Sequence, residues 1–483
     1  MIDVVVIGAG IVGASVAREL TKFDLNVLVV ERASDVCEGA TKANSAIVHS
    51  GVDAKPGTLK AKYNVLGNKL YDKGEEELNI KLMRNGSLNL CFDDSNKKEV
   101  IDDLYEQGLK NGVEGMRIVE REELLQMEPN IQDNVICALY CPTAGIIDSF
   151  EVNIAFAENA AHNGAKFKFD TKVIGFNKKE DGNWIVKTDR GDIQTRAVVN
   201  CAGIQSDDLN NLVSETKRNI TARRGEYYLL DKKEKDFVRH TIFQPPTKAG
   251  KGVLIAPTVS DNIIIGPNAH AVDKDDTTTS RAGLEEVALK VGFSVKNVPL
   301  RSTITTFSGL RATEDGNDFI IGEVEDAPLF FNCVGIESPG LTSAPAIAID
   351  VADDVAEKLG AATNPDFDPI RPRPIVFMEL SDEEKDELIK KDPTYGHMVC
   401  RCEFITEGEI ISAMHRAPVA TNLDGIKRRT RAGSGRCQAG FCMTRQIELL
   451  QKEHLVSPFS ISKFGKDSTL LVSNNKDGFG EVN

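Results

Sequence analysis

Apolar and polar residues at the start of the chain predict a strand, a helix and a second strand in succession. Residues 3–7 form a short apolar run of the kind found in buried parallel strands, and residues 11–20 repeat apolar positions at helical spacing. A second apolar run, at residues 26–30, ends at the acidic residue Glu31. This order is typical of a parallel sheet covered by helices.

Three glycines connect the first predicted strand to the helix. Gly8, Gly10 and Gly13 have the spacing G-x-G-x-x-G. The first glycine of this motif permits a tight turn, the second lets a pyrophosphate approach the backbone, and the third allows close helix–strand packing. The helix N-terminus favours phosphates, and Glu31 is placed to accept hydrogen bonds from ribose hydroxyls. The sequence therefore predicts a dinucleotide site.

Helical and strand-like patterns continue along the chain. Amphipathic helices are predicted at residues 59–80, 97–110 and 149–163, the last with Asp148 or Ser149 as its N-cap. Residues 221–310 alternate in the manner of strands and predict a sheet-rich roof for a substrate site. Further buried strands are predicted at residues 167–175, 184–188, 197–203 and 330–334, and a glycine-rich turn at 335–342 leads into a helix that reaches about residue 359.

Composition and charge narrow the class of protein. The chain has 483 residues, enough for roughly two to four domains. No run of roughly 18 apolar residues could span a membrane, and the chain starts with a strand instead of the basic segment of a signal peptide, so we expect a cytoplasmic protein. The net charge of −15 repels nucleic acid and anionic lipid, so neither is an expected partner.

Four of the ten cysteines lie close together near the C-terminal end, at Cys400, Cys402, Cys437 and Cys442. They form a C-x-C … C-x4-C pattern, and a set of four thiolates selects zinc or an iron–sulfur cluster. Residues 425–435 are rich in arginine and glycine, whose charges and N–H groups could stabilise a negatively charged cluster. The other six are expected to be buried small hydrophobic side chains: Cys37, Cys91, Cys137, Cys141, Cys201 and Cys333.

The N-terminal glycine motif, the segment 198–203 and the turn 335–342 together resemble the D-amino-acid-oxidase superfamily of FAD enzymes. The resemblance covers roughly residues 1–370. It implies an extended FAD, with its adenine near Glu31 and its flavin ring near His49 and Gly340. It also implies contacts from the cofactor to Ala202, Gly203, Leu341 and Thr342. No second glycine triplet for NAD is visible in the sequence, so nicotinamide is not the expected electron acceptor.

Two branches of that superfamily match different parts of the chain. Residues 44–62 and 224–228 resemble L-2-hydroxyglutarate dehydrogenases, whereas the pairing of a flavin domain with a cysteine-rich tail resembles the A subunit of anaerobic glycerol-3-phosphate dehydrogenase. Both substrates are small anions, and Arg311 could hold a carboxylate or a phosphate with two parallel hydrogen bonds. Ala312 stands where glycerol-3-phosphate enzymes usually carry proline, which counts against a phosphate substrate.

The tail at residues 397–450 resembles the bacterioferritin-associated-ferredoxin type of [2Fe-2S] domain. The resemblance is carried by the order of the cysteines and by the segment RRTRAGSGRCQAGFC at residues 428–442. It implies that the four cysteines hold a [2Fe-2S] cluster. Electrons would then leave singly to an acceptor protein or a quinone-linked subunit, and any membrane association would be peripheral and through such a partner.

We therefore predict an FAD-dependent dehydrogenase that oxidises the C2 hydroxyl of a small anion, with glycerol 3-phosphate giving dihydroxyacetone phosphate as the first expectation. Alternatives are an L-2-hydroxy-acid dehydrogenase, an amino-acid dehydrogenase and a non-catalytic redox conduit subunit. His49 is expected to take the hydroxyl proton or to orient the substrate, with His270 as the alternative, and Arg311 to hold the anionic group.

The predicted fold class is α/β, with a Rossmann-like FAD-binding domain, a sheet-rich substrate domain and a small helical iron–sulfur domain. The predicted boundaries are an FAD-binding part at residues 1–80, 145–220 and 310–370, a substrate part at 81–144 and 221–309, a linker at 371–396, the [2Fe-2S] domain at 397–455 and a tail at 456–483.

Overall fold

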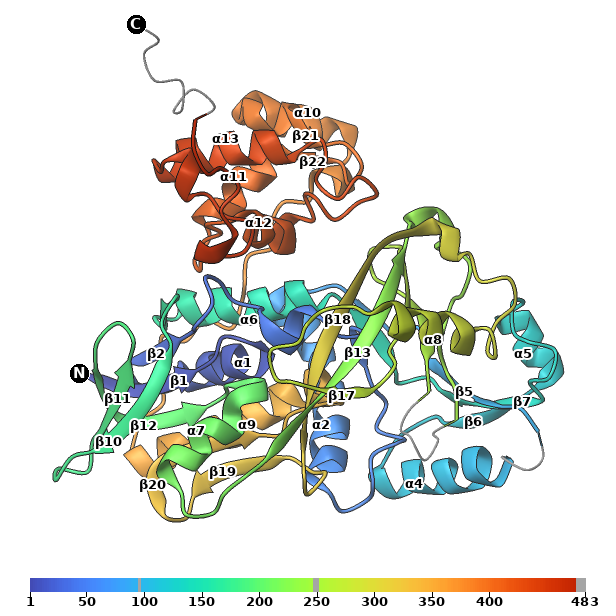
Figure 1. Cartoon of the computed structure of the whole chain (residues 1–483), viewed down its shortest axis with the longest axis horizontal. Coiled ribbons are helices and arrows are strands. Elements are labelled where there is room, and N and C mark those ends of the chain that lie inside the picture. Colours follow the sequence, from blue (N-terminus) through green and yellow to red (C-terminus); the bar gives the residue numbers. More distant parts are fainter. Residues whose placement is uncertain (94–96, 246–251, 475–483) are drawn as a thin grey trace, which may run out of the picture.

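The computed structural model describes residues 1–93, 97–245 and 252–474, and the first predicted strand lies inside its eight-stranded sheet (Figure 1). β1 (Ile2–Ile7) pairs in parallel with β2 (Val27–Val30) and with β12 (Ile193–Asn200). Because the carboxyl ends of parallel strands meet at one edge, the residues that follow these three strands lie together. The other strands are β9 (Lys166–Lys168), β10 (Val173–Lys178), β11 (Trp184–Thr188), β19 (Ile320–Val324) and β20 (Ala327–Val334).

Helices cover one face of this sheet, and α1 (Ile11–Leu20) contacts both α6 (Ser149–His162) and α9 (Gly340–Leu359). Val4 and Val6 pack in the core that includes these helices. Val5 and Ile7 pack on the opposite face. Their core also contains Trp184 of β11 and, from α7 (Ser206–Val213), Leu209. The strand is buried on both faces, which explains why its sequence is apolar throughout.

A nine-stranded sheet forms a second layer with a separate core (Figure 1). Its strand order is β17-β13-β16-β15-β14-β5-β7-β6, and β18 runs antiparallel along the whole of β13. α8 (Arg281–Val291) packs against β13 and β16. The strands are β5 (Ser87–Cys91), β6 (Arg117–Glu120), β7 (Cys137–Cys141), β13 (Ile220–Leu230), β14 (Thr241–Phe243), β15 (Leu254–Pro257), β16 (Ile263–Gly266), β17 (His270–Val272) and β18 (Thr303–Glu314).

A small sheet accompanies the two large ones. It contains β3 (Ile47–Val48), β8 (Gly145–Ile147) and β4 (Leu82–Met83), with β8 in the middle. The helices α2 (Leu59–Leu78), α4 (Leu104–Asn111) and α5 (Arg121–Met127) complete this part of the chain. α2 contacts α9, so the segment after β3 is packed onto the first large sheet's helical layer.

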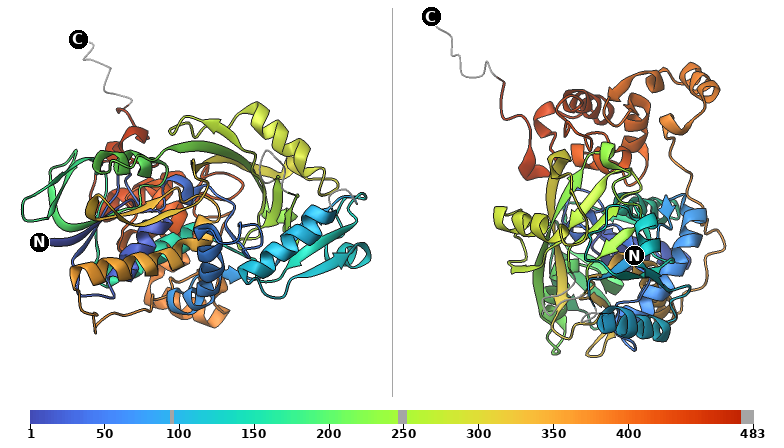
Figure 2. Two further views of the ribbon diagram at one scale, coloured as in Figure 1. Left: turned by 90° about the horizontal axis from the view of Figure 1, so that it is seen from below. Right: turned by 90° about the vertical axis from the view of Figure 1, so that its right-hand side faces the viewer.

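The C-terminal part folds around its own small core and sits on top of the rest in Figure 1. The chain that leads to it runs along the flank of the first domain (Figure 2), where the Arg371 N–H donates to the carbonyl of Glu77. Among the helices of the described residues, none is long and apolar enough to cross a membrane. The elements of this part are α10 (Asp382–Lys391), β21 (Met398–Cys400), β22 (Ile405–Thr406), α11 (Glu407–His415), α12 (Leu423–Thr430) and α13 (Met443–His454).

The α/β fold class predicted from the sequence is confirmed. Of the two predicted N-cap candidates, Asp148 caps α6, and its side chain accepts hydrogen bonds from the N–H groups of Phe150 and Glu151. The strand predicted at 167–175 is wrong as one continuous element. It is two strands, β9 and β10, because Asp170 adopts a left-handed conformation (φ 51°) and the chain turns there.

Two further predictions differ from the structure or extend past it. The helix predicted at 97–110 is a regular α-helix only from Leu104, after a π-helical segment at Lys98–Asp103. Residues 94–96 and 246–251 of the predicted substrate part, and residues 475–483 of the predicted tail, lie outside the described residues.

Candidate functional site

The turn after β1 has the shape that the glycine motif predicts. Gly8 has a φ of +102°, and a Cβ there would stand 2.4 Å from the carbonyl oxygen of Cys201. A Cβ on Gly13 would stand 1.9 Å from the carbonyl oxygen of Gly8, so the helix approaches the strand as only glycine allows. Gly10 precedes α1 and provides no side-chain cap, and the Ile11 N–H of the first turn donates to Thr41 Oγ1 at 3.0 Å; the positive end of the helix dipole there suits a phosphate.

Glu31 follows β2 and its carboxylate lies beside the glycine turn. One oxygen accepts a hydrogen bond from the Ala9 N–H at 2.8 Å, and the other accepts from the Ala33 N–H at 2.8 Å. Burial raises the pKa of this carboxyl group, although both backbone hydrogen bonds act in the opposite direction. A carboxylate can accept about four hydrogen bonds, so Glu31 retains capacity for ribose hydroxyls.

Ala202 and Gly203 lie in the turn that follows β12, next to the same glycine motif. A Cβ on Gly8 would lie 3.4 Å from the Cα of Ala202, and Gly203 itself has a φ of +57°. The parallel arrangement of β1 and β12 is the reason these distant segments meet. The structure thus brings Gly8, Glu31, Ala202 and Gly203 to one edge of the sheet, where an extended dinucleotide would fit.

The N-terminus of α9 is tied to the loop that carries His49. Thr342 Oγ1 accepts a hydrogen bond from the His49 N–H at 2.9 Å and donates to the carbonyl of Ile47 at 3.2 Å. The carbonyl of Leu341 accepts a hydrogen bond from the Tyr71 hydroxyl at 2.6 Å. Gly340 begins the helix, and no side chain caps it. Gly340, Leu341 and Thr342 therefore place a helix N-terminus beside His49.

The His49 side chain is enclosed by residues from three different elements. Its ring stacks on Phe243 of β14 with centroids 5.9 Å apart, and its Nε2 lies 3.5 Å from the Ser338 hydroxyl. A cavity of about 20 Å³ beside it is also lined by Asn89 of β5, whose amide nitrogen is buried and has no hydrogen-bond partner among the described residues. Phe243 and Asn89 are not predictable from the sequence as site residues, because each lies in an ordinary strand pattern.

Arg311 reaches the same region from β18. Residues two apart in a strand face the same side, so Gly309, Arg311 and Thr313 share one face. A Cβ on Gly309 would stand 1.9 Å from the carbonyl oxygen of Ala43, and the Thr313 hydroxyl donates to Glu337 at 2.6 Å. The face of β18 that carries Arg311 therefore contacts two loops: the one with Ala43, which leads to His49, and the one with Glu337, which leads to Ser338.

The guanidinium of Arg311 has room because of a glycine on the neighbouring strand. Arg311 Nη1 donates to the carbonyl of Asn268 at 3.2 Å, and a Cβ on Gly225 would stand 3.1 Å from Nη2. His270, the alternative base, is half exposed and pairs with Glu286 of α8 at 2.6 Å. His270 is therefore directed toward α8, whereas Arg311 stands two residues from Thr313, whose partner Glu337 precedes Ser338, the neighbour of His49.

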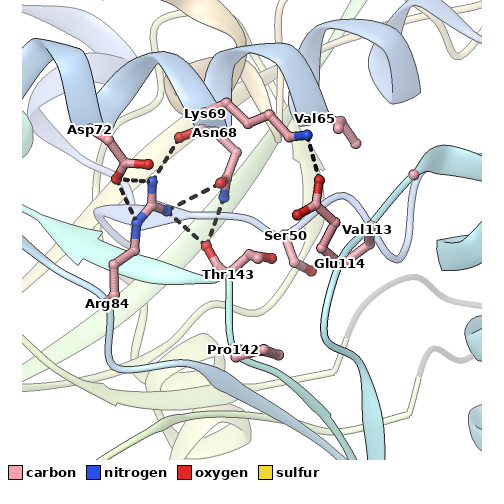
Figure 3. A pocket seen from close by; sticks show the side chains of 11 residues that line it. Ser50, Val65, Asn68, Lys69, Asp72, Arg84, Val113, Glu114, Pro142 and Thr143 are labelled. Carbon is pink, nitrogen blue, oxygen red and sulfur yellow. Dashed lines mark hydrogen bonds and ion pairs between the residues drawn. The ribbon is translucent and has the colours of Figure 1, made fainter.

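A larger cavity of about 570 Å³ lies next to this region and shares Ser50 with the small one (Figure 3). Its cation, Arg84, is already held by Asp72, Asn68 and the carbonyl of Thr143. Its second cation, Lys69, pairs with Glu114 at 2.7 Å. Both of these cations are already paired, which disfavours this cavity as an anion site.

The four cysteines of the tail lie close together in space, although they are spread over 43 residues of the sequence. The Sγ atoms of Cys400 and Cys402 are 3.8 Å apart, and those of Cys402 and Cys437 are 3.6 Å apart. A hydrogen bond to Cys400 lowers the pKa of Cys442, whose Sγ also accepts a hydrogen bond from Gln446 at 3.0 Å. The described residues contain no group of three or more histidine, cysteine or acidic side chains placed around one metal ion, but the thiols are close in successive pairs. Four thiol sulfurs in one place fit the ligand set of a [2Fe-2S] cluster.

The arginines of the segment 425–435 form ion pairs with carboxylates. Arg428 and Arg429 pair with Asp35, which lies in the loop after β2. Arg431 pairs with Glu403 at 2.9 Å. Arg428 and Arg429 thus have a buried carboxylate as their partner, and the expectation that cations of this segment stabilise the cluster's charge stays a prediction.

Two family models account for most of the chain. The model described as FAD dependent oxidoreductase matches residues 3–354, and the one described as BFD-like [2Fe-2S] binding domain matches residues 398–452. The chain therefore belongs to the FAD-dependent oxidoreductase family and carries an additional [2Fe-2S]-binding domain. The FAD and [2Fe-2S] predictions are confirmed, and so is the prediction of an FAD-dependent enzyme.

Relatives with known names refine this assignment. A glycerol 3-phosphate dehydrogenase of Caloramator mitchellensis is 48% identical over 480 residues, which are 99% of each chain. A glycerol 3-phosphate oxidase of Mycoplasma pneumoniae is 29% identical over 71% of this chain and 92% of its own. The solved structure of reduced L-α-glycerophosphate oxidase from M. pneumoniae with FAD bound matches with a TM-score of 0.73 and 27% identity, over 77% of this chain and 99% of its own. Human mitochondrial L-2-hydroxyglutarate dehydrogenase is 32% identical over 55% of this chain and 60% of its own, so that likeness is local.

Proposed function

We propose that this protein oxidises glycerol 3-phosphate to dihydroxyacetone phosphate and passes the electrons to its own [2Fe-2S] cluster. The main support is the likeness of the complete chain, both domains included, to a glycerol 3-phosphate dehydrogenase at 48% identity. FAD, when bound, would supply the acceptor for the hydride from C2 of the substrate. The protein's contribution is to bind the anion, to take the hydroxyl proton and to exclude water.

Arg311 and His49 divide these tasks in the proposal. Arg311 would hold the phosphate with two parallel hydrogen bonds, since its guanidinium is planar and always charged. His49 would accept the proton of the C2 hydroxyl at Nε2, the nitrogen that lies 3.5 Å from the Ser338 hydroxyl. Stacking on Phe243 and the hydrogen bond from the His49 N–H to Thr342 hold the imidazole and its backbone in position.

The glycine-rich edge of the sheet would hold the cofactor. Gly8, Gly10 and Gly13 would lie against the pyrophosphate, Glu31 against the ribose, and Ala202 and Gly203 along the dinucleotide. Gly340, Leu341 and Thr342 would contact the flavin ring with the N-terminus of α9. Cys400, Cys402, Cys437 and Cys442 would hold the cluster.

The identity of residue 312 does not oppose a phosphate substrate. Ala312 is the residue after Arg311 on β18, so its side chain points to the opposite face of the strand. It is buried and packs with Ile220 and Val334. Its side chain therefore does not share the face from which Arg311 would hold the substrate.

A protein acceptor is the second part of the proposal. Large, apolar and exposed side chains lie close to two of the cysteines: Phe441, directly before Cys442, is 86% exposed, and Phe404, two residues after Cys402, is 53% exposed. Arg401, between Cys400 and Cys402, is also exposed. Exposed aromatic and arginine side chains are typical of protein contact surfaces, which supports an acceptor protein or a quinone-linked subunit in the cytoplasm.

An L-2-hydroxy-acid dehydrogenase is the second candidate, because the local likeness to L-2-hydroxyglutarate dehydrogenase includes 285 residues at 32% identity. The deciding experiment adds glycerol 3-phosphate and L-2-hydroxyglutarate separately, without oxygen, to the protein loaded with FAD and cluster. We expect bleaching of the flavin band near about 450 nm with the first compound alone. Bleaching with the second alone would replace the proposal by the second candidate, and no bleaching with any small hydroxy or amino acid would indicate a conduit subunit.

A further inference from the structure

A single buried carboxylate of the first domain is held by two arginines of the iron–sulfur domain. Arg429 contacts both oxygens of Asp35, at 2.7 and 2.8 Å, and Arg428 contacts one of them at 2.9 Å. The side chains of Asp35 and Arg429 are 0% exposed and that of Arg428 is 2% exposed. Two parallel hydrogen bonds from one guanidinium fix direction as well as distance.

Asp35 belongs to a loop that also serves the predicted cofactor site. The loop follows Glu31 and continues to Thr41, whose Oγ1 accepts a hydrogen bond from the N–H of Ile11 in the first turn of α1. Helix α12 approaches this loop closely because residue 425 is glycine: a Cβ there would stand 2.8 Å from Asp35 Oδ2. The iron–sulfur domain therefore rests directly on the segment that connects the ribose and phosphate positions.

Two further acidic residues from outside the C-terminal part form ion pairs with arginines of the linker or of the iron–sulfur domain. Glu158 of α6 accepts from Arg371 of the linker at 2.6 Å and from Arg416 at 3.0 Å. Asp231, at the end of β13, pairs with Arg436 at 3.1 Å, one residue before the ligand Cys437. Asp35, Glu158 and Asp231 are far apart in the sequence, so the C-terminal domain is held at separate places, and the ion pair of Lys232 with Glu403 at 2.9 Å adds to these contacts.

Buried ion pairs of this kind favour one orientation more than they add net stability. Transferring charged side chains out of water costs free energy. The attraction between the charges offsets this cost only when their hydrogen-bond geometry is good. The Nε atoms of Arg428 and Arg429 have no hydrogen-bond partner within the described part of the chain, which adds to the cost. A shifted position that kept these side chains buried would separate Asp35 from the two arginines and leave buried charges without those partners.

We propose that Arg428 and Arg429 are positioning residues, which seat the iron–sulfur domain on Asp35 in one fixed orientation so that electrons pass from flavin to cluster within the chain. The inference about the seat stands on the ion pairs alone. The inference about electron transfer rests on the proposed function.

The test uses the complete chain loaded with FAD and cluster. The double variant Arg428→Gln with Arg429→Gln removes both cations, and Gly425→Ala obstructs the same seat without changing any charge. Asp133→Asn removes an exposed carboxylate that pairs with Lys296 and serves as the matched control. Small-angle X-ray scattering reports the position of the domain without substrate, and anaerobic mixing with glycerol 3-phosphate reports flavin bleaching and cluster reduction separately.

We expect the radius of gyration to increase in the double variant and in Gly425→Ala, which we call the two seat variants, and to stay unchanged in Asp133→Asn. Flavin bleaching should stay within about two-fold of the parent protein, while cluster reduction should slow by about 10-fold or more, because a detached domain loses its proximity. Scattering identical to that of the parent in both seat variants would overturn the proposal, and so would equally slow cluster reduction in the control. If the double variant loses its cluster, Gly425→Ala decides. Failure of the parent protein to bleach with glycerol 3-phosphate would reject the proposed function, whereas the scattering result would still test the seat.

Discussion

Alternation along β18 places Gly309, Arg311 and Thr313 on one face, and that face meets the loops around His49. Gly309 lets the strand approach Ala43, and Thr313 holds Glu337 at 2.6 Å. Arg311 stands between these two contacts. At the scale of single residues, the site depends on this register, since a shift by one residue would turn Arg311 to the opposite face.

Replacement of Arg311 by alanine should weaken substrate binding and leave the cofactors in place. Hydrogen bonds to a charged group contribute about 1.5–3 kcal/mol, so we expect KM to rise roughly 10- to 150-fold. Steady-state kinetics with glycerol 3-phosphate measures the change, and Arg117→Ala, which removes an exposed arginine paired with Glu123, is the control. An unchanged KM would remove Arg311 from the substrate site.

Replacement of His49 by glutamine should slow the chemical step. Loss of a general base reduces the rate by roughly 10²- to 10⁴-fold, and we expect that reduction in the anaerobic rate of flavin bleaching at saturating substrate. Ser338→Ala, which removes only the neighbouring hydroxyl, should have a much smaller effect. Bleaching at the parent rate in His49→Gln would show that another group accepts the proton.

At the scale of elements, the sequence predicts those features that one local segment contains. The glycine spacing predicts the turn between β1 and α1, and the Asp148 cap is read directly from residues next to it. The environment of His49 is not predictable in this way, because Phe243 and Asn89 come from strands that alternate like any other. Asp35 is likewise a single acid in a loop, and its partner Arg428 is 393 residues away.

The cysteine pattern leads to a prediction about the C-terminal elements alone. Cys400→Ser with Cys402→Ser should abolish the visible absorption of the cluster and leave FAD bound, because the tail has its own core. Cys137→Ser, which changes a buried cysteine of the second sheet, should keep both cofactors. Absorption spectra of the purified proteins check this, and loss of both cofactors together would argue against separate binding sites.

At the scale of the whole molecule, acid should release the iron–sulfur domain. Burial raises the pKa of the Asp35 carboxyl group, but the guanidiniums of Arg429 and Arg428 outweigh it and hold that pKa below its usual value. Burial likewise acts against the ionised form of Glu158, and Arg371 and Arg416 outweigh it, so its pKa is also lowered. A lowered pKa stabilises the docked state at pH values above the unfolded pKa of about 4, and this stabilisation is lost as the pH falls below it.

We therefore expect the radius of gyration to be constant above about pH 5 and to increase as the pH falls below about 4. Asp35→Asn should weaken docking already at neutral pH and make its further loss in acid less steep. Scattering measured across this pH range checks both expectations. Identical acid profiles for Asp35→Asn and the parent protein would show that Asp35 does not control docking.

The most direct test of the complete account is an electron paramagnetic resonance spectrum of the protein, recorded after anaerobic addition of glycerol 3-phosphate. If substrate oxidation and the cluster are connected in one chain, the signal of a reduced [2Fe-2S] cluster should appear, and it should be absent from the variant Cys400→Ser with Cys402→Ser. A flavin that bleaches while the cluster stays oxidised would contradict the internal electron route. A flavin that glycerol 3-phosphate does not reduce would contradict the proposed function itself.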